Sequence, residues 1–148
     1  VGVTMVIGII GESCVGKSTL AQRLKEELGA EVITGRDYLR LAKSEAVAKK
    51  LFAKQLDEAL TGKHLVYVIS EREHLALLPE GSLRVLMTAD LPLILERFGL
   101  RMRGQLPEPV KQMLEKKHGS FDREVCNFHI HNNTGMESVV EKIREAAF

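Results

Sequence analysis

Two glycines, a lysine and a serine are spaced within residues 11–18, which read GESCVGKS. This segment fits the phosphate-binding loop pattern G-x-x-x-x-G-K-[S/T] at every fixed position. In such a loop, glycines let the chain curl so that backbone N–H groups surround phosphate oxygens, and the lysine adds positive charge. The segment predicts a nucleoside triphosphate site, with ATP as the expected ligand. The expected binding residues are Gly11, Glu12, Ser13, Cys14, Val15, Gly16, Lys17, Ser18 and Thr19.

Lys17 and Ser18 have separate expected roles. Lys17 is a candidate catalytic residue that reaches the β and γ phosphates, and the Ser18 hydroxyl is the expected protein ligand of Mg²⁺. Both residues open a predicted helix, whose dipole favours negative charge there. The alternative is a glycine-rich turn before an ordinary helix. The apolar run at 3–10 and the helical pattern at 18–28 argue against it, because strand, loop and helix is the order that the motif requires.

Composition excludes several other classes of function. A chain of 148 residues with 45% apolar and 28% charged residues is typical of one globular domain. The net charge of +1 argues against general nucleic-acid binding, and no apolar run approaches the ~18 residues of a membrane span. Cys14 and Cys126 are too few for a disulfide framework, although Cys14 lies where a thiol can become oxidisable. We expect a cytoplasmic protein, monomeric or weakly homodimeric, without nucleic-acid or membrane partners.

Strands alternate with helices along the chain. Apolar stretches predict strands at 3–10, 30–33, 64–70, 83–88 and 128–132. Helical patterns fall at 18–28, 37–43, 44–60, 71–78, 90–98, 110–118 and 136–147. The alternation predicts an α/β fold of three layers, in which a five-stranded parallel sheet has helices on both faces. Residues 99–109 contain two glycines and two prolines, and we expect a loop there that interrupts the helix.

Basic residues gather between positions 97 and 118. The segment contains six lysines or arginines and two glutamates, a local excess of four positive charges. Phosphoryl transfer needs positive charge around a highly anionic transition state. Arg97, Arg101 and Arg103 are therefore candidate catalytic cations, and a solvated basic surface is the alternative.

Asp37, Arg40 and Arg72 are the candidate residues for the acceptor. Arg40 can hold an acceptor phosphate with paired hydrogen bonds, whereas Asp37 can instead cap its predicted helix. Arg72 follows a central strand, at the sheet edge where ligands gather in open α/β folds. Glu71 either orients Mg²⁺ through water or simply starts a helix.

Two histidines and an aspartate can have either structural or functional roles. His129 and His131 alternate on a predicted strand, so they point to one face. A two-histidine metal pair is one interpretation, but packed or exposed histidines are favoured because no third ligand is near in sequence. Asp90 precedes a predicted helix and is expected to cap it.

The chain resembles the small P-loop kinases of nucleoside monophosphates, and among them the cytidylate kinase-like proteins most closely. Residues 83–97, LRVLMTADLPLILER, are similar to their fourth strand, Ala-x-Leu turn and arginine-bearing helix before a mobile lid. Residues 34–40, TGRDYLR, resemble the TGDxxR segment of adenylate kinases with one insertion. Arg72 looks like the arginine after their third strand. Residues 127–133, NFHIHNN, resemble their last strand, after which the chain passes the adenine ring.

The resemblance implies a single P-loop kinase domain over residues 1–148. It implies a short acceptor-binding insert at about 35–62 and a lid at about 99–118. The implied activity is ATP- and Mg²⁺-dependent phosphoryl transfer to a nucleoside monophosphate, a small phosphorylated acceptor. Two alternatives stay open. One is a P-loop kinase of a small hydroxylated metabolite, with Asp37 as general base. The other is a non-catalytic nucleotide-binding module.

Overall fold

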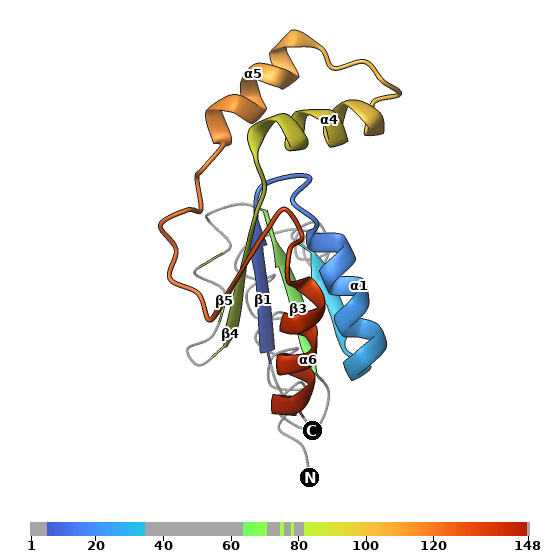
Figure 1. Cartoon of the computed structure of the whole chain (residues 1–148), viewed down its shortest axis with the longest axis vertical. Coiled ribbons are helices and arrows are strands. Elements are labelled where there is room, and N and C mark those ends of the chain that lie inside the picture. Colours follow the sequence, from blue (N-terminus) through green and yellow to red (C-terminus); the bar gives the residue numbers. More distant parts are fainter. Residues whose placement is uncertain (1–5, 35–63, 71–74, 76–77, 79–81, 148) are drawn as a thin grey trace, which may run out of the picture.

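The computed structural model describes residues 6–34, 64–70, 75, 78 and 82–147, and its described strands form one parallel sheet (Figure 1). The strands pair side by side in the order β2-β3-β1-β4-β5. Their bounds are β1 (Val6–Gly11), β2 (Glu31–Thr34), β3 (Leu65–Ile69), β4 (Leu83–Thr88) and β5 (Phe128–His131). The predicted five-stranded parallel sheet is confirmed.

Two helices pack against one face of the sheet. They are α1 (Lys17–Leu28) and α6 (Met136–Ala147), which lie next to each other in Figure 1. Their apolar side chains share a core with Ile7 and Ile9 of β1, both fully buried. On the opposite face, Ile10 packs with Tyr67 and Phe121, and all three are at most 3% exposed. Both faces of the central strands are therefore covered, as their unbroken apolar sequence predicts.

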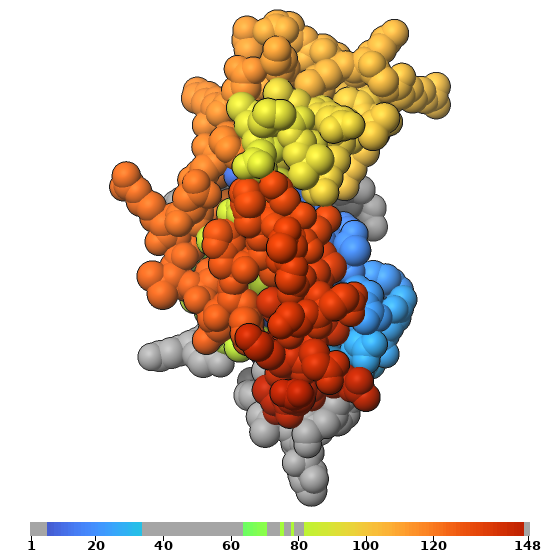
Figure 2. All heavy atoms as spheres, viewed as in Figure 1, coloured from blue at the N-terminus to red at the C-terminus, as the bar shows by residue number. Residues whose placement is uncertain are grey.

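The remaining described helices form a hairpin beyond the carboxyl ends of the strands. They are α4 (Leu91–Arg101) and α5 (Glu108–Lys117), which we call the α4–α5 hairpin. It stands above the sheet in Figure 1, and in the space-filling view it forms the yellow and orange top of the molecule (Figure 2). The hairpin contains the basic segment identified in the sequence.

The predicted loop at 99–109 is too long. Helix α4 continues through Gly99 to Arg101, and the chain then turns where Gly104 (φ 82°) donates from its N–H to the Gly99 carbonyl oxygen at 2.8 Å. Helix α5 already includes Pro109, which sits in the first turn, where a missing N–H removes no helical hydrogen bond. The turn between the helices is thereby limited to residues 102–107.

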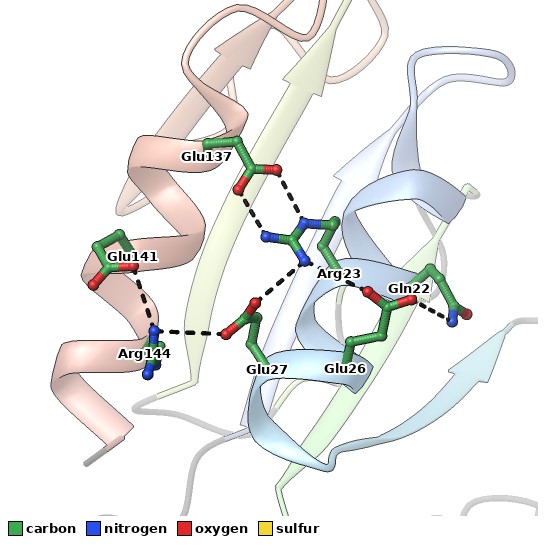
Figure 3. A network of polar contacts seen from close by, with 7 residues as sticks. All are labelled: Gln22, Arg23, Glu26, Glu27, Glu137, Glu141 and Arg144. Carbon is green, nitrogen blue, oxygen red and sulfur yellow. Dashed lines mark hydrogen bonds and ion pairs between the residues drawn. The ribbon is translucent and has the colours of Figure 1, made fainter.

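A network of charged side chains joins α1 to α6 at the surface (Figure 3). Arg23 donates to both carboxylate oxygens of Glu137, with distances of 3.0 Å from Nε and 2.8 Å from Nη2. Glu27 lies 3.2 Å from Arg23 Nη1 and 3.8 Å from Arg144 Nη1. Paired guanidinium–carboxylate geometry fixes the relative position of the two helices more firmly than a single contact does.

Among the helices that the structure describes, none is both long enough and apolar enough to cross a bilayer.

Candidate functional site

The phosphate-binding loop connects β1 to α1, as the motif requires. Cys14 (φ 63°) and Gly16 (φ 102°) are both in the left-handed region. Backbone that alternates in handedness turns successive N–H groups toward one concave side and makes an anion-binding nest. Within the described part of the chain, no backbone carbonyl accepts a hydrogen bond from the amides of residues 13–16. The loop therefore has the backbone geometry of a phosphate site.

Gly11 is required by close packing against backbone, and Gly16 by its left-handed backbone beside the Asn133 side chain. A Cβ atom on Gly16 would lie 2.2 Å from the side-chain amide of Asn133, in the turn between β5 and α6. A Cβ atom on Gly11 would lie 2.5 Å from the carbonyl oxygen of Met87 in β4. The loop is thus pressed between neighbouring elements, and larger residues would displace it.

Lys17 lies within the curl of the loop. Its side chain is buried, and its Nζ donates to the carbonyl oxygens of Gly11, at 2.8 Å, and Glu12. Ser18 and Thr19 follow in the first turn of α1, and both are exposed. An ammonium group inside an amide nest and a hydroxyl at its rim are the donor set that fits a polyphosphate with a hard cation.

Arg97 and Asn133 hold the loop from outside. Arg97 Nη1 donates to the Cys14 carbonyl oxygen at 3.0 Å. With its amide oriented to satisfy its neighbours, Asn133 donates to the Val15 carbonyl oxygen at 3.1 Å and accepts from Arg97 Nη2 at 3.2 Å. In a trans peptide the C=O and the following N–H point in opposite directions. Fixing the carbonyls of Cys14 and Val15 outward therefore directs the next two N–H groups inward.

The other candidate arginines lie further from the loop. Arg101 is exposed at the end of α4, and Arg103 is exposed in the following turn with φ 62°. In the ranges that the structure covers, neither makes a hydrogen bond or ion pair with the loop. Arg97 and Arg101, four positions apart, lie on one face of α4, because the helix is continuous through Gly99.

Glu12 provides a contact that sequence reasoning missed. Its carboxylate is buried, with Oε1 at 3.2 Å from His118 Nδ1, and its Oε2 accepts from the Gly119 N–H at 3.1 Å. Glu12 occupies a variable position of the motif, so no spacing rule marks its side chain. A small cavity of about 40 Å³ lies beside this contact, between the loop and α5. Its lining includes Ser13, Ser70, Met113 and Lys117.

Histidines at the β4–β5 edge bind a shared threonine. His129 Nε2 and His131 Nδ1 each lie 2.7 Å from Thr88 Oγ1, which confirms that the two rings point to one face. They line a cavity of about 570 Å³ together with His118 and Asp122. Among the residues that the structure describes, no group of three or more His, Cys, Asp or Glu side chains could hold a metal ion. Both histidine side chains are exposed and lie within hydrogen-bond distance of Thr88, so the geometry supports exposed histidines over packed ones.

The prediction that Asp90 caps α4 with its side chain is wrong. Asp90 occupies the N-cap position, but its carboxylate makes no capping hydrogen bond. It instead accepts from Asn132 Nδ2 at 2.9 Å and lies 3.1 Å from His131 Nε2. The hydrogen bond from Asn132 is the main reason that the pKa of Asp90 lies below its ordinary value. These partners, more than 40 positions away in sequence, compete with the local cap.

Several candidates cannot be placed in this geometry. Asp37, Arg40, Arg72 and Glu71 lie outside the described residues. Cys14 is among the described residues and is only 5% exposed, which opposes the oxidation that its position in the loop suggested.

No protein-family model matches this sequence, and no curated protein sequence matches it significantly. Solved structures match over nearly the whole chain. Shikimate kinase from Acinetobacter baumannii, in complex with shikimate, is 22% identical with a TM-score of 0.62, covering 94% of this chain and 90% of that one. A putative kinase from Chloroflexus aurantiacus is 14% identical with a TM-score of 0.67, covering 97% and 96%. This chain shares the fold of these kinases. A gluconokinase from Sinorhizobium meliloti shares the fold at 16% identity and a TM-score of 0.59, covering 99% and 93%.

The shared fold accounts for the position of the site. The phosphate-binding loop follows the central strand β1, and the α4–α5 hairpin follows β4 next to it in the sheet. Two of the three neighbours are named for shikimate and gluconate, whereas the sequence resemblance points to nucleoside monophosphates. At sequence identities of 22% or less, these similarities establish the fold and not the substrate.

Proposed function

We propose that this protein is an ATP-dependent kinase that transfers the γ-phosphoryl group to a small acceptor. The observation that carries the proposal is the shape of the loop. Its left-handed residues and its outward-held carbonyls turn N–H groups toward the position of Lys17. Such a site binds the triphosphate and leaves the terminal phosphoryl group exposed to attack.

The proposed chemistry relies on positioning and charge. Lys17 would neutralise charge on the β and γ phosphates, and Ser18 would hold Mg²⁺, which would supply further positive charge for the transfer. Arg97 stabilises the loop, and Arg101 and Arg103 are proposed to add charge around the transferred group. These roles require little covalent chemistry from the protein.

The acceptor has two candidates. The sequence resemblance supports a nucleoside monophosphate, whose phosphate Arg40 and Arg72 would hold. The names of two structural neighbours, which act on shikimate and gluconate, support a small hydroxylated metabolite instead. In that case Asp37 would accept the proton of the attacking hydroxyl as general base.

The direct test is a phosphoryl-transfer screen. Purified protein with Mg²⁺ and ATP labelled at the γ phosphate is offered nucleoside monophosphates, shikimate, gluconate and other polyols. Transfer to a monophosphate supports the first candidate, and transfer only to hydroxylated metabolites overturns it in favour of the second. Tight ATP binding by calorimetry with no transfer to any acceptor would overturn the kinase proposal and leave a nucleotide-binding module.

Three variants connect the screen to the site. Lys17→Met is expected to abolish transfer, and Lys25→Met, which changes an exposed lysine at the other end of α1, is expected to leave it intact. Asp37→Asn separates the acceptor classes, because an ionised phosphate acceptor needs no base. A large loss of kcat with unchanged acceptor binding supports a hydroxyl acceptor, whereas an unchanged kcat supports a phosphate acceptor.

A further inference from the structure

Glu12 places a negative charge inside a loop built to bind anions. Its side chain is buried, so bulk water screens the charge of its carboxylate only weakly. A carboxylate directed at the nest would repel a triphosphate. Here both oxygens are instead occupied at the end of α5, by His118 Nδ1 at 3.2 Å and by the Gly119 N–H at 3.1 Å.

The receiving backbone is held in a fixed direction. Gly119 adopts φ 80°, a conformation that other residues rarely take. A Cβ atom at this position would also lie 3.2 Å from Asp122 Oδ2. A turn that favours glycine, at the end of α5, thus directs the Gly119 N–H toward Glu12.

The contact between Glu12 and the end of α5 also sets the position of Lys117 relative to the phosphate-binding loop. Lys117 immediately precedes His118, and it lines the small cavity together with Ser13 of the loop and Ser70 after β3. The carboxyl ends of parallel strands are where ligands gather in open α/β sheets. Docking the end of α5 on Glu12 thus places a lysine at the junction of the donor loop and the neighbouring central strand.

We propose that Glu12 is a positioning residue for phosphoryl transfer: its carboxylate fixes the end of α5 on the phosphate-binding loop and so keeps Lys117 beside the transferred group. This inference rests on the proposed kinase function. The loop amides and Lys17 bind the triphosphate without help from Glu12. Loss of its carboxylate therefore lowers kcat and has little effect on the KM for ATP.

A purely electrostatic role for Glu12 gives the opposite result. If Glu12 were only a negative charge in the loop, its removal would raise ATP affinity and leave kcat unchanged. The split between KM and kcat therefore distinguishes the two roles.

The test compares Glu12→Ala and Glu12→Gln with a matched control. Glu115→Ala removes an exposed carboxylate from α5, three positions before His118. For Glu12→Ala we expect kcat to fall about tenfold, because small displacements of charged groups are costly in phosphoryl transfer. The KM for ATP should stay within about twofold. Glu12→Gln should retain most of kcat, since its amide oxygen still accepts from Gly119, and Glu115→Ala should match the parent protein.

His118→Asn provides a rescue. The Asn side-chain amide nitrogen lies near the place of the His Nδ1 and can still donate to Glu12, so His118→Asn should retain more activity than His118→Ala. Equal loss in both variants would count against a hydrogen-bonded anchor.

The amide proton of Gly119 reports the contact without any substrate. Hydrogen exchange followed by NMR should be about tenfold faster at Gly119 in Glu12→Ala than in the parent or in Glu115→Ala. An active parent with unchanged kcat in Glu12→Ala, or with unchanged exchange at Gly119, overturns the positioning role alone. A parent that transfers phosphate to no acceptor overturns the kinase proposal, whatever the exchange at Gly119 shows.

Discussion

Arg97 Nη1 donates a hydrogen bond to the carbonyl oxygen of Cys14, 3.0 Å away and 83 positions earlier in the sequence. The hydrogen bond joins α4 to the phosphate-binding loop and is strengthened by the charge of the guanidinium. Asn133 completes the contact from the turn after β5. The shape of the loop is therefore a tertiary property and is not fixed by the motif alone.

Replacing Arg97 should weaken nucleotide binding. Arg97→Ala leaves the Cys14 carbonyl without its charged donor, which costs about 1.5–3 kcal/mol for such a hydrogen bond, or at least about tenfold in the Kd for ATP. Arg97→Lys should give an intermediate loss. Arg101→Ala on the same helix should leave the Kd within about twofold, because that residue is exposed. Calorimetric titration with ATP measures all three, and an unaltered Kd in Arg97→Ala would contradict the bracing role.

Gly16→Ala should damage the loop more than a second glycine replacement does. Both Gly16 (φ 102°) and Gly29 (φ 66°) are left-handed, but only the Cβ at 16 meets an obstacle, the Asn133 amide at 2.2 Å. Gly29→Ala therefore carries only backbone strain, of about 1 kcal/mol. We expect Gly16→Ala to lose ATP binding by more than about tenfold and Gly29→Ala to retain it. Thermal melts and ATP titrations of both variants check this, and equal ATP affinities would refute it.

The pairing of Glu137 with Arg23 should make stability depend on pH. The hydrogen bond from Arg23 lowers the pKa of Glu137 below its ordinary value of 4.5. The stabilisation is complete above that ordinary pKa and is lost as the pH falls through the lowered pKa. Glu137→Gln should therefore have a lower Tm than the parent at pH 7, with the difference shrinking in acid. Glu141→Gln is the control, because its contact with Arg144 is a single one of 3.9 Å. A difference that grows below pH 4.5 would contradict the assignment.

Thr88→Val should destabilise the β4–β5 edge. Thr88 is 8% exposed, and its hydroxyl lies 2.7 Å from both His129 and His131. Replacement by an isosteric apolar side chain leaves two ring nitrogens without this partner. Both rings are exposed and can bond to water instead, so we expect a loss of about 0.5–1.5 kcal/mol in the free energy of unfolding. Urea denaturation measures it, with Thr134→Val, an exposed threonine, as the control. Equal midpoints for Thr88→Val and Thr134→Val would show that the shared hydroxyl contributes nothing.

The fold could be predicted from the sequence because its signals are local and repeated. The bounds of β4 and α6 match the predicted ranges 83–88 and 136–147, since apolar periodicity determines both. The error at Gly99 has a physical cause. One glycine costs a helix about 1 kcal/mol, which the rest of an apolar helix face outweighs, so α4 continues to Arg101.

The contacts around the loop could not be predicted in the same way. The motif identified Lys17 and the glycines because phosphate chemistry fixes their spacing. Glu12, Asn133 and His118 are brought together only by the order of strands in the sheet, and no spacing rule connects them. Asp90 shows the same limit, because partners in a distant segment overrode its local tendency to cap a helix.

The α4–α5 hairpin is supported at two points on the same loop, through Arg97 on Cys14 and through His118 on Glu12. The hairpin is therefore attached to the loop at both of its ends. A lid attached at one end can rotate about that end, but rotation of this hairpin about either contact would break the other. Opening must lift one support from the loop or bend the span at residues 102–107, so a ligand that reshapes the loop acts on both supports at once.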